Sequence, residues 1–285
     1  MKTNKLILPL LVFGLAITCS TFGQGIYFGV GGGYGFSAAK DQFGPDVKTT
    51  VSASGSSSTY TSKAFSLGKG VSLGAYGGYM LNKNIGLELG IGYLIGSKTT
   101  TTNETDAPSP AGTSTSTGTV YGSMLRLTPA IRIEAGEGKI RPYGVVGLII
   151  GLAPKATFES DSMTNGNERD QITTFSGRTS WGFHGAVGVR YAVNDKIGIF
   201  AEITGNYMSW APGKSLITKD TYNGKDLLAS QTTSQKETDF SSSSTFTGGT
   251  GVAATPATPN QGNLVYLPFS SMGFNIGVHI TLGGK

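Results

Sequence analysis

The 285-residue chain lacks any run of about 18 consecutive apolar residues, the minimum for a membrane-spanning helix. Its single cysteine cannot form an intramolecular disulfide, and its two histidines, His184 and His279, lie on separate segments and make a weak metal site. Charged residues make up only 14% of the chain and form no basic run, which argues against nucleic-acid binding. If the chain spans a membrane, it must do so as a closed β-barrel, because lipid cannot satisfy open strand edges.

Glycine, by contrast, is abundant: there are 44 glycines, without the G-X-Y period that would indicate collagen. Most of them lie in segments where small and apolar residues alternate. The segment 29–33 resembles a phosphate-binding loop only in composition, because it lacks the Lys-Ser/Thr pair and the following helix. We therefore predict no cofactor.

The first 23 residues have the features of a secretory signal peptide. Lys2 and Lys5 supply positive charge, residues 6–17 form an apolar stretch, and Gly23 is a small residue at a plausible cleavage site. An alternative is lipidation of Cys19, but the residue before it is threonine, where lipoprotein signals have Gly, Ala or Ser. We predict cleavage after Gly23. The mature chain would then hold 20 basic and 17 acidic residues, a net charge of +3, and no cysteine.

Eight stretches alternate apolar with small or polar residues, which is the pattern of a strand with one apolar face. Each is at least about ten residues long, the length that a tilted strand needs to cross a bilayer. The last stretch is the clearest, with Met272, Phe274, Ile276, Val278, Ile280 and Leu282 on one face. The predicted strands span residues 25–37, 70–81, 85–97, 120–135, 139–153, 179–193, 196–209 and 270–283.

Short and long connections between these strands alternate strictly. The short ones are at 82–84, 137–138 and 194–195, and the long ones are at about 38–69, 98–119, 154–178 and 210–269. Outer-membrane barrels have short periplasmic turns and long external loops, whereas a soluble barrel has no reason to gather every long loop at one end. The sequence therefore predicts an all-β fold: a transmembrane up-and-down antiparallel barrel of eight strands, formed by residues 24–285.

The long connections contain polar low-complexity tracts, at 54–58, 99–102 and 241–244. Such tracts cannot bury enough surface to fold alone, so we predict mobility there. The connection at 210–269 is far longer than an ordinary loop. It either carries short strands that extend the barrel outward or is a solvated, disordered loop.

Aromatic residues near the predicted strand ends indicate the girdles that such barrels place at the two membrane interfaces. A general preference of aromatics for strands would not predict this clustering at the ends. If both termini are periplasmic, the external group is Tyr34, Phe36, Tyr93, Tyr121, Trp181, Tyr207 and Trp210, and the periplasmic group is Tyr79 and Tyr191.

Alternation also assigns each strand residue to the lipid face or to the interior. A basic residue facing lipid at the midplane would cost about 2–4 kcal/mol, and buried charges must be paired. Seven charged residues all fall on the interior face: Glu88, Arg126, Arg132, Glu134, Arg141, Arg190 and Glu202. We predict that they form a structural charge network inside the barrel.

Hairpin registers predict the partners within this network. A two-residue turn at 137–138 would place Glu134 opposite Arg141, at a spacing that allows an ion pair. A turn centred on residue 194 would place Ala186 opposite Glu202, which leaves Arg190 two positions farther along. We therefore predict one group at mid-barrel, consisting of Glu88 and Glu202 with Arg126 and Arg190, and a second nearer the periplasm, consisting of Glu134 and Arg141.

The interior charges have two interpretations. They are either an ion or proton pathway or a network that holds the barrel together, and an eight-stranded barrel is just wide enough for side chains to fill. Catalysis would require a nucleophile and an orienting acid near a histidine. Ser180, His184 and Glu202 form only a loose constellation on neighbouring strands. We therefore predict no catalytic residue and no metal site, and we favour the structural network.

The signal peptide, the eight strands, the alternating connections and the glycine- and aromatic-rich first strand, residues 26–35, together resemble the OmpA-type outer-membrane β-barrel proteins. The resemblance covers the whole mature chain. It implies location in the outer membrane of a Gram-negative bacterium, assembly by the barrel insertion machinery, and roles in envelope integrity, surface contact or slow solute passage. Such barrels often end in an aromatic assembly signal, whereas here Phe274 lies upstream of the C-terminal Lys285.

We therefore expect a non-enzymatic outer-membrane protein with a structural or surface-interaction role. The alternatives are a small, porin-like pore for small or hydrophobic solutes and a lipid-modifying barrel enzyme, although the predicted lipid face offers that enzyme no histidine or acidic residue. The expected partners are outer-membrane lipid and lipopolysaccharide, the barrel assembly machinery, and an extracellular ligand that contacts the long loops.

Overall fold

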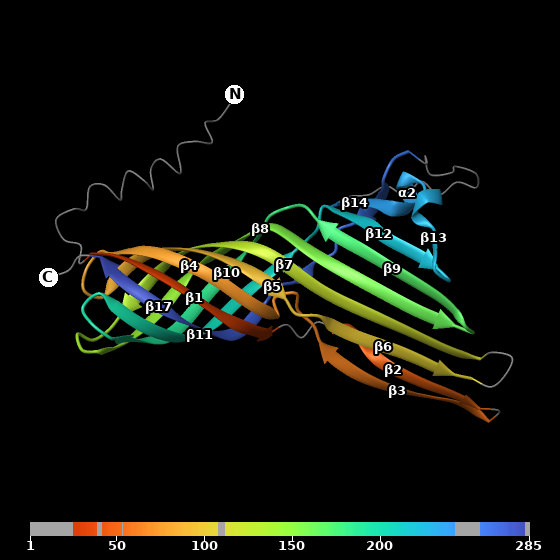
Figure 1. Ribbon diagram of the computed structural model, residues 1–285, viewed down its shortest axis with the longest axis horizontal. Coiled ribbons are helices and arrows are strands. Elements are labelled where there is room, and N and C mark those ends of the chain that lie inside the picture. The colour runs from red at the N-terminus through yellow and green to blue at the C-terminus, as the bar shows by residue number, and fades with distance from the viewer. Residues whose placement is uncertain (1–24, 39–41, 53, 108–111, 243–256, 283–285) are drawn as a thin grey trace.

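The chain folds almost entirely into β-strands (Figure 1). The computed structural model describes residues 25–38, 42–52, 54–107, 112–242 and 257–282. The predicted signal peptide, its cleavage site and Cys19 lie outside these residues. Within the described ranges, no helix has the length and apolar character needed to cross a membrane.

Eight strands close into a ring in which every neighbouring pair is antiparallel, which confirms the predicted barrel. The pairing of the last strand with the first closes the ring. In order around the ring, the strands are β1 (Gly25–Ser37), β4 (Gly70–Met80), β5 (Ile85–Gly96), β7 (Thr113–Glu134), β8 (Ile140–Thr164), β10 (Ser180–Ala192), β11 (Ile197–Trp210) and β17 (Ser271–Leu282).

The period-two alternation places the apolar side chains of these strands on the outside of the barrel. Leu89 of β5 is 53% exposed, Val187 of β10 is 73% exposed and Ile276 of β17 is 61% exposed. The intervening residues face inward and are mostly glycine, polar or charged. A surface so apolar is suited to lipid rather than to water.

Three tight turns join the barrel strands at one end, which we call the short-turn end. In two of them an asparagine side chain caps the turn, since Asn82 Oδ1 accepts hydrogen bonds from the backbone N–H groups of Asn84 and Ile85, both at 2.8 Å. Asn194 Oδ1 accepts from Lys196 and Ile197 at 2.9 and 2.8 Å in the same way. Asparagine is favoured in turns because its side chain bonds to the backbone two residues on.

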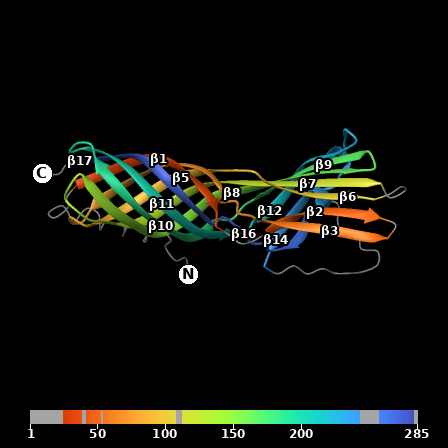
Figure 2. The ribbon, with the colours of Figure 1, turned by 90° about the horizontal axis from the view of Figure 1, so that it is seen from below.

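At the opposite end, which we call the extended end, β7 and β8 continue well past the barrel, with 22 and 25 residues. They form the middle of an open sheet, the extension, whose strand order is β3-β2-β6-β7-β8-β9-β12-β14-β15 (Figures 1 and 2). The added strands are β2 (Gln42–Ser52), β3 (Gly55–Ala64), β6 (Thr99–Asp106), β9 (Asn167–Ser176), β12 (Lys214–Tyr222), β14 (Glu237–Ser241) and β15 (Asn260–Asn263).

The polar tracts predicted to be mobile are paired strands where the structure describes them. Residues 99–102 lie in β6, where Thr99 and Thr101 are buried and the Thr100 hydroxyl lies 3.0 Å from that of Thr119. Residues 55–58 lie in β3. These tracts do not fold alone. Strand β6 pairs with β7, and β3 pairs with β2, which in turn pairs with β6. These strands are therefore ordered by pairing onto β7, which is itself a strand of the barrel.

The long connection at 210–269 carries strands that extend the sheet, as one of the two interpretations of the sequence predicted. Besides β12, β14 and β15, it contains the short elements β13 (Lys225–Asp226), η1 (Leu228–Ser230), α2 (Thr233–Lys236) and β16 (Leu267–Pro268). The remaining part, residues 243–256 with most of the predicted 241–244 tract, lies outside the described residues.

Of the residues predicted for the external aromatic girdle, the structure exposes Trp181 and Tyr207 but buries Trp210. Trp181 and Tyr207 lie toward the extended end of the barrel with most of their surface exposed. Trp210, in contrast, is buried, and its indole N–H donates to the Gly177 carbonyl at 2.9 Å. Trp210 is the last residue of β11 and lies on the interior face of the strand. Its side chain therefore packs among buried apolar residues instead of lying at the membrane interface.

A buried carboxylate in the extension makes its stability depend on pH. Asp220 of β12 is fully buried and receives two hydrogen bonds from Arg169 of β9, at 3.0 and 2.9 Å, with further bonds from Gln171 and Gln231. The Arg169 guanidinium, followed by Gln231 and Gln171, lowers the pKa of Asp220 below its ordinary 3.8. The carboxylate therefore stabilises the extension above that pH, and this stabilisation is lost as the pH falls through the lower, folded value.

We expect the amide protection of β9 and β12 to fall between about pH 5 and pH 2, while the barrel strands remain protected. Hydrogen exchange, corrected for the intrinsic pH dependence of each amide, measures this. An Asp220→Asn variant should show reduced protection of β9 and β12 already at pH 7 and little further change in acid. Equal acid sensitivity of the two proteins would contradict the assignment.

Candidate functional site

The interior of the barrel is built in three layers along its axis. The layer nearest the extended end is an apolar cluster whose members are almost completely buried. Two segments outside the barrel strands complete this cluster, one with Phe65 and Leu67 and the other with Phe269. Backbone hydrogen bonds hold them in place: the N–H of Leu67 donates to Pro268 and that of Phe269 donates to Met208, both at 2.9 Å. The cluster consists of Phe65, Leu67, Leu94, Val120, Met124, Ile149, Ala156, Met208, Trp210 and Phe269.

The layer nearest the short-turn end is a charge network centred on Glu134. Its carboxylate pairs with Arg132 at 3.4 Å, with Arg141 at 3.6 Å and with Arg190. Arg132 also pairs with Glu88 at 3.1 Å. Three of the four arginines and two of the three glutamates predicted to face inward therefore form one connected network, in which Arg132 is only 1% exposed.

Three tyrosines, Tyr27, Tyr76 and Tyr143, and one histidine, His279, belong to the same layer. The Tyr27 hydroxyl donates to Glu88 at 3.3 Å, and the Arg132 guanidinium lies 3.8 Å from the centre of the Tyr143 ring, within cation–π range. The Tyr76 hydroxyl lies 3.1 Å from Nδ1 of His279. All four share the inward parity of the charged residues. Parity predicted this for His279, and the same alternation applied to aromatic side chains would have found the three tyrosines.

The predicted pairs are partly wrong because two hairpin registers differ from those predicted. Glu134 lies opposite Tyr143 rather than Arg141, and Glu202 lies opposite Gly188 rather than Ala186. In each hairpin the partner moves by two residues, which keeps every side chain on its predicted face. The Glu134–Arg141 pair survives at the longer distance given above, whereas Arg190 pairs with Glu134 instead of lying with Glu202.

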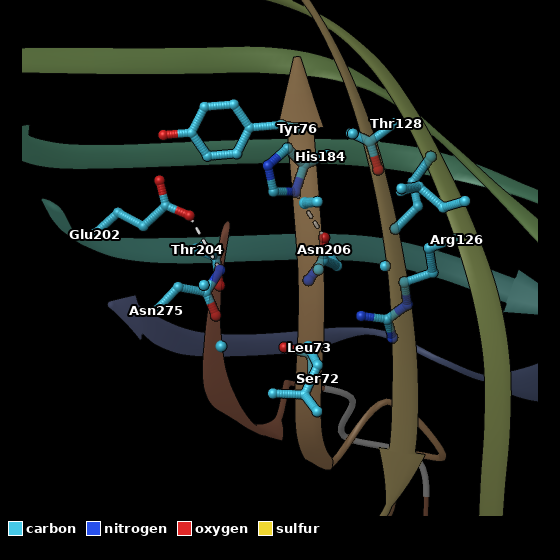
Figure 3. A pocket seen from close by; sticks show the side chains of 18 of the residues that line it. Ser72, Leu73, Tyr76, Arg126, Thr128, His184, Glu202, Thr204, Asn206 and Asn275 are labelled. Carbon is cyan, nitrogen blue, oxygen red and sulfur yellow. Dashed lines mark hydrogen bonds between the residues drawn. The ribbon is translucent and has the colours of Figure 1, made fainter. Parts of the chain in front are cut away.

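The middle layer surrounds a cavity of about 150 Å³ (Figure 3). Glu202 is held at its edge, where it accepts hydrogen bonds from the Tyr143 hydroxyl at 2.8 Å and from the Asn275 amide at 3.0 Å. Arg126 lines the same cavity but forms no ion pair with any described residue, which corrects its predicted pairing with Glu88 and Glu202. Other polar residues that line the cavity are Ser72, Tyr76, Glu88, Thr128, His184, Thr204, Asn206 and Asn275.

The weakly indicated catalytic constellation is not assembled. His184 Nδ1 lies 2.8 Å from the Asn206 side-chain oxygen. The Ser180 hydroxyl points to the sulfur atoms of Met208 and Met124, at 3.3 and 3.9 Å, and Glu202 is engaged by other partners. A serine can act as a nucleophile only when a base accepts its proton, and no such contact joins Ser180 to His184 in the described part of the chain.

A family model matches most of this chain. The model of the family described as outer membrane protein beta-barrel domain matches residues 10–231, which include every barrel strand but the last. Among solved structures, the crystal structure of the outer membrane protein OprG from Pseudomonas aeruginosa is similar over 92% of this chain and 98% of that chain, with 14% identity and a TM-score of 0.37. The search of the curated proteins found no match. On the extent of the family match, the chain belongs to the outer membrane protein β-barrel domain family.

Proposed function

We propose that this protein is a non-enzymatic component of the outer membrane that contacts a partner outside the cell through its extension. The chain would be exported by a signal peptide cleaved after Gly23 and inserted by the barrel assembly machinery, with lipid and lipopolysaccharide around it. Outer-membrane barrels place their short turns in the periplasm, so the extended end would face the exterior of the cell.

The observation that carries this proposal is the open sheet that continues from the barrel. Strand β3 is exposed along nearly its whole length and pairs only with β2 among the described strands. A free strand edge presents backbone N–H and C=O groups to which an extended segment of another protein can pair. The opposite edge strand of the extension is β15, which pairs with β14.

Removal of either edge tests the proposal. One variant replaces residues 42–64 with a short Gly/Ser linker, and a second replaces residues 225–263, while both retain all eight barrel strands. We expect at least one variant to lose most of the binding of intact cells to immobilised host or matrix proteins, because the contacting edge is gone. As a control for barrel folding, heated and unheated samples of each variant should differ in gel migration as those of the wild type do. Full binding by both variants would contradict the role of the extension.

The contents of the barrel favour this role over a pore. The apolar cluster fills the extended end, and the network around Glu134 fills the short-turn end. We therefore expect no steady single-channel current from the purified protein in planar bilayers. Steady currents that Arg126→Leu abolishes would favour a pore instead.

A separate experiment tests the non-enzymatic assignment. The protein is incubated with lipopolysaccharide and the acyl chains are followed by mass spectrometry. Loss of acyl chains would contradict the assignment.

A further inference from the structure

Arg126 differs from the other arginines inside the barrel because no carboxylate of the described residues pairs with it. Its side chain comes from the middle of β7 and the residue is only 8% exposed. Arg132, Arg141 and Arg190 each have a carboxylate oxygen within 4 Å. The Nε and Nη2 atoms of Arg126, in contrast, are buried and have no hydrogen-bond partner among the described residues. A buried charge without a partner is costly, so a group that the chain itself does not supply is expected there.

The carboxylates of the interior are already engaged by other groups. Glu88 and Glu134 are held by Arg132, Arg141 and Arg190. The two oxygens of Glu202 accept hydrogen bonds from Tyr143 and Asn275. The seven charged residues predicted to face inward comprise four arginines and three glutamates, so the interior holds one positive charge in excess. Arg126 is the arginine among them that has no carboxylate within ion-pair distance among the described residues.

The backbone around Arg126 leaves room for an additional group. Arg126 lies opposite Gly92 on one side and Gly151 on the other. The row continues through Gly74 and Gly31, which lie opposite Gly92 and Gly74 in turn. Because glycine has no side chain, Gly31, Gly74 and Gly92 leave open the cavity of about 150 Å³ that Arg126 also lines (Figure 3). Gly151 does not line this cavity, since Ser180 and Met124 fill the space beside it. A single water molecule occupies about 30 Å³ of liquid volume, so several atoms fit.

The chemistry of the free atoms specifies the kind of group. The Nε–H and one Nη2–H of a guanidinium point in parallel along one edge of the planar group, which matches the two oxygens of a carboxylate. Both unpartnered nitrogens of Arg126 belong to this edge. The cavity is also lined by the neutral hydroxyls of Thr128 and Thr204 and the amide of Asn206. Two carboxylates line it as well, and both are engaged: Glu88 by Arg132, and Glu202 by Tyr143 and Asn275.

We propose that Arg126 binds a small monocarboxylate anion in this cavity as the counter-ion of the barrel interior. The bound anion neutralises the excess positive charge and satisfies Nε and Nη2 together. The site lies between the apolar cluster and the charge network, so its occupancy is coupled to the folded barrel. This inference is independent of the extracellular contact proposed above, because it concerns no residue of the extension.

Arginine side-chain NMR with formate as the probe tests the proposal. Protein labelled with ¹⁵N-arginine is refolded in micelles in mixtures of sodium formate and sodium chloride at constant ionic strength. We expect the Arg126 Nε–Hε resonance, identified by its loss in Arg126→Lys, to shift saturably with formate. The Arg141 resonance serves as the control within the same spectrum, because its Nε already donates to the Gly138 carbonyl at 3.0 Å and the residue lies outside the cavity.

A stability measurement provides a second, separate readout. The temperature at which the folded band converts to the unfolded band on gels should rise when formate replaces chloride in the wild type, and this shift should be lost in Arg126→Met. An Arg126 resonance that does not respond or moves only linearly, or an equal response of Arg141, would overturn the proposal and indicate that water alone fills the cavity. So would the same formate-dependent shift in the methionine variant. If that variant does not refold, the wild-type titration alone decides the question.

Discussion

Replacement of Glu134 by glutamine should lower the free energy of unfolding of the barrel by about 3–5 kcal/mol, the cost of removing one partner from a buried ion pair. Glu134 is 5% exposed and is the shared partner of Arg132, Arg141 and Arg190. Glutamine has nearly the same shape, so packing is retained while the negative charge is lost. Three guanidinium groups would then remain close together with only Glu88 to balance them. The repulsion among these three guanidinium groups adds to the free-energy cost of their desolvation, which Glu134 no longer offsets.

Glu137→Gln is the matched control, because it makes the same chemical change only three residues away. Glu137 pairs with Lys83 at 3.0 Å in a short turn, and both side chains are mostly exposed, so we expect a change of about 0–1 kcal/mol. Reversible urea unfolding of both variants in lipid vesicles, followed by tryptophan fluorescence, measures the difference. A Glu134→Gln barrel as stable as the Glu137→Gln barrel would show that the network does not hold the barrel together.

The second large effect is expected on the outer surface of the barrel. Val187→Arg should destabilise the protein in vesicles by about 2–4 kcal/mol, because a basic side chain at the bilayer midplane must be removed from water. Val187 is at the middle of β10, and its side chain is the most exposed of the apolar residues on that strand. The chemical change is large, yet it disturbs no interior contact, so the cost reports on the surroundings of the strand.

Val193→Arg is the corresponding control, because Val193 is an equally apolar, exposed residue in the tight turn that follows β10. An arginine near the interface costs only about 0–1 kcal/mol. The free energies of unfolding of the two variants, measured in the same way, therefore report how deep in the bilayer each position lies. Equal destabilisation by the two substitutions would mean that lipid does not surround the middle of β10, and the membrane orientation of the barrel would have to be abandoned.

The side on which each strand residue lies could be predicted from the sequence, because alternation is a local property. The backbone pleat sends successive side chains to opposite faces whatever the neighbouring strand is. Leu89, Val187 and Ile276 therefore lie outside, and Arg132, Glu134 and His279 lie inside, as their parity predicts. The number of barrel strands and the grouping of long connections at one end follow from the same local patterns.

The partners of the interior residues were decided only by the tertiary structure. An error of about one residue in the centre of a turn moves each cross-strand partner by two residues, which preserves the face but changes the pair, as it did for Glu202. The contact of Glu134 with Arg190 joins β7 to β10, which β8 separates in the ring. The contact of Arg132 with Glu88 is diagonal between the paired strands β7 and β5, because Glu88 lies opposite Ala130. Both contacts depend on how the closed ring aligns its strands, and no short segment carries that information. The same holds for the extension, whose polar strands are ordered by pairing and not by their own composition, and for the unpartnered Arg126.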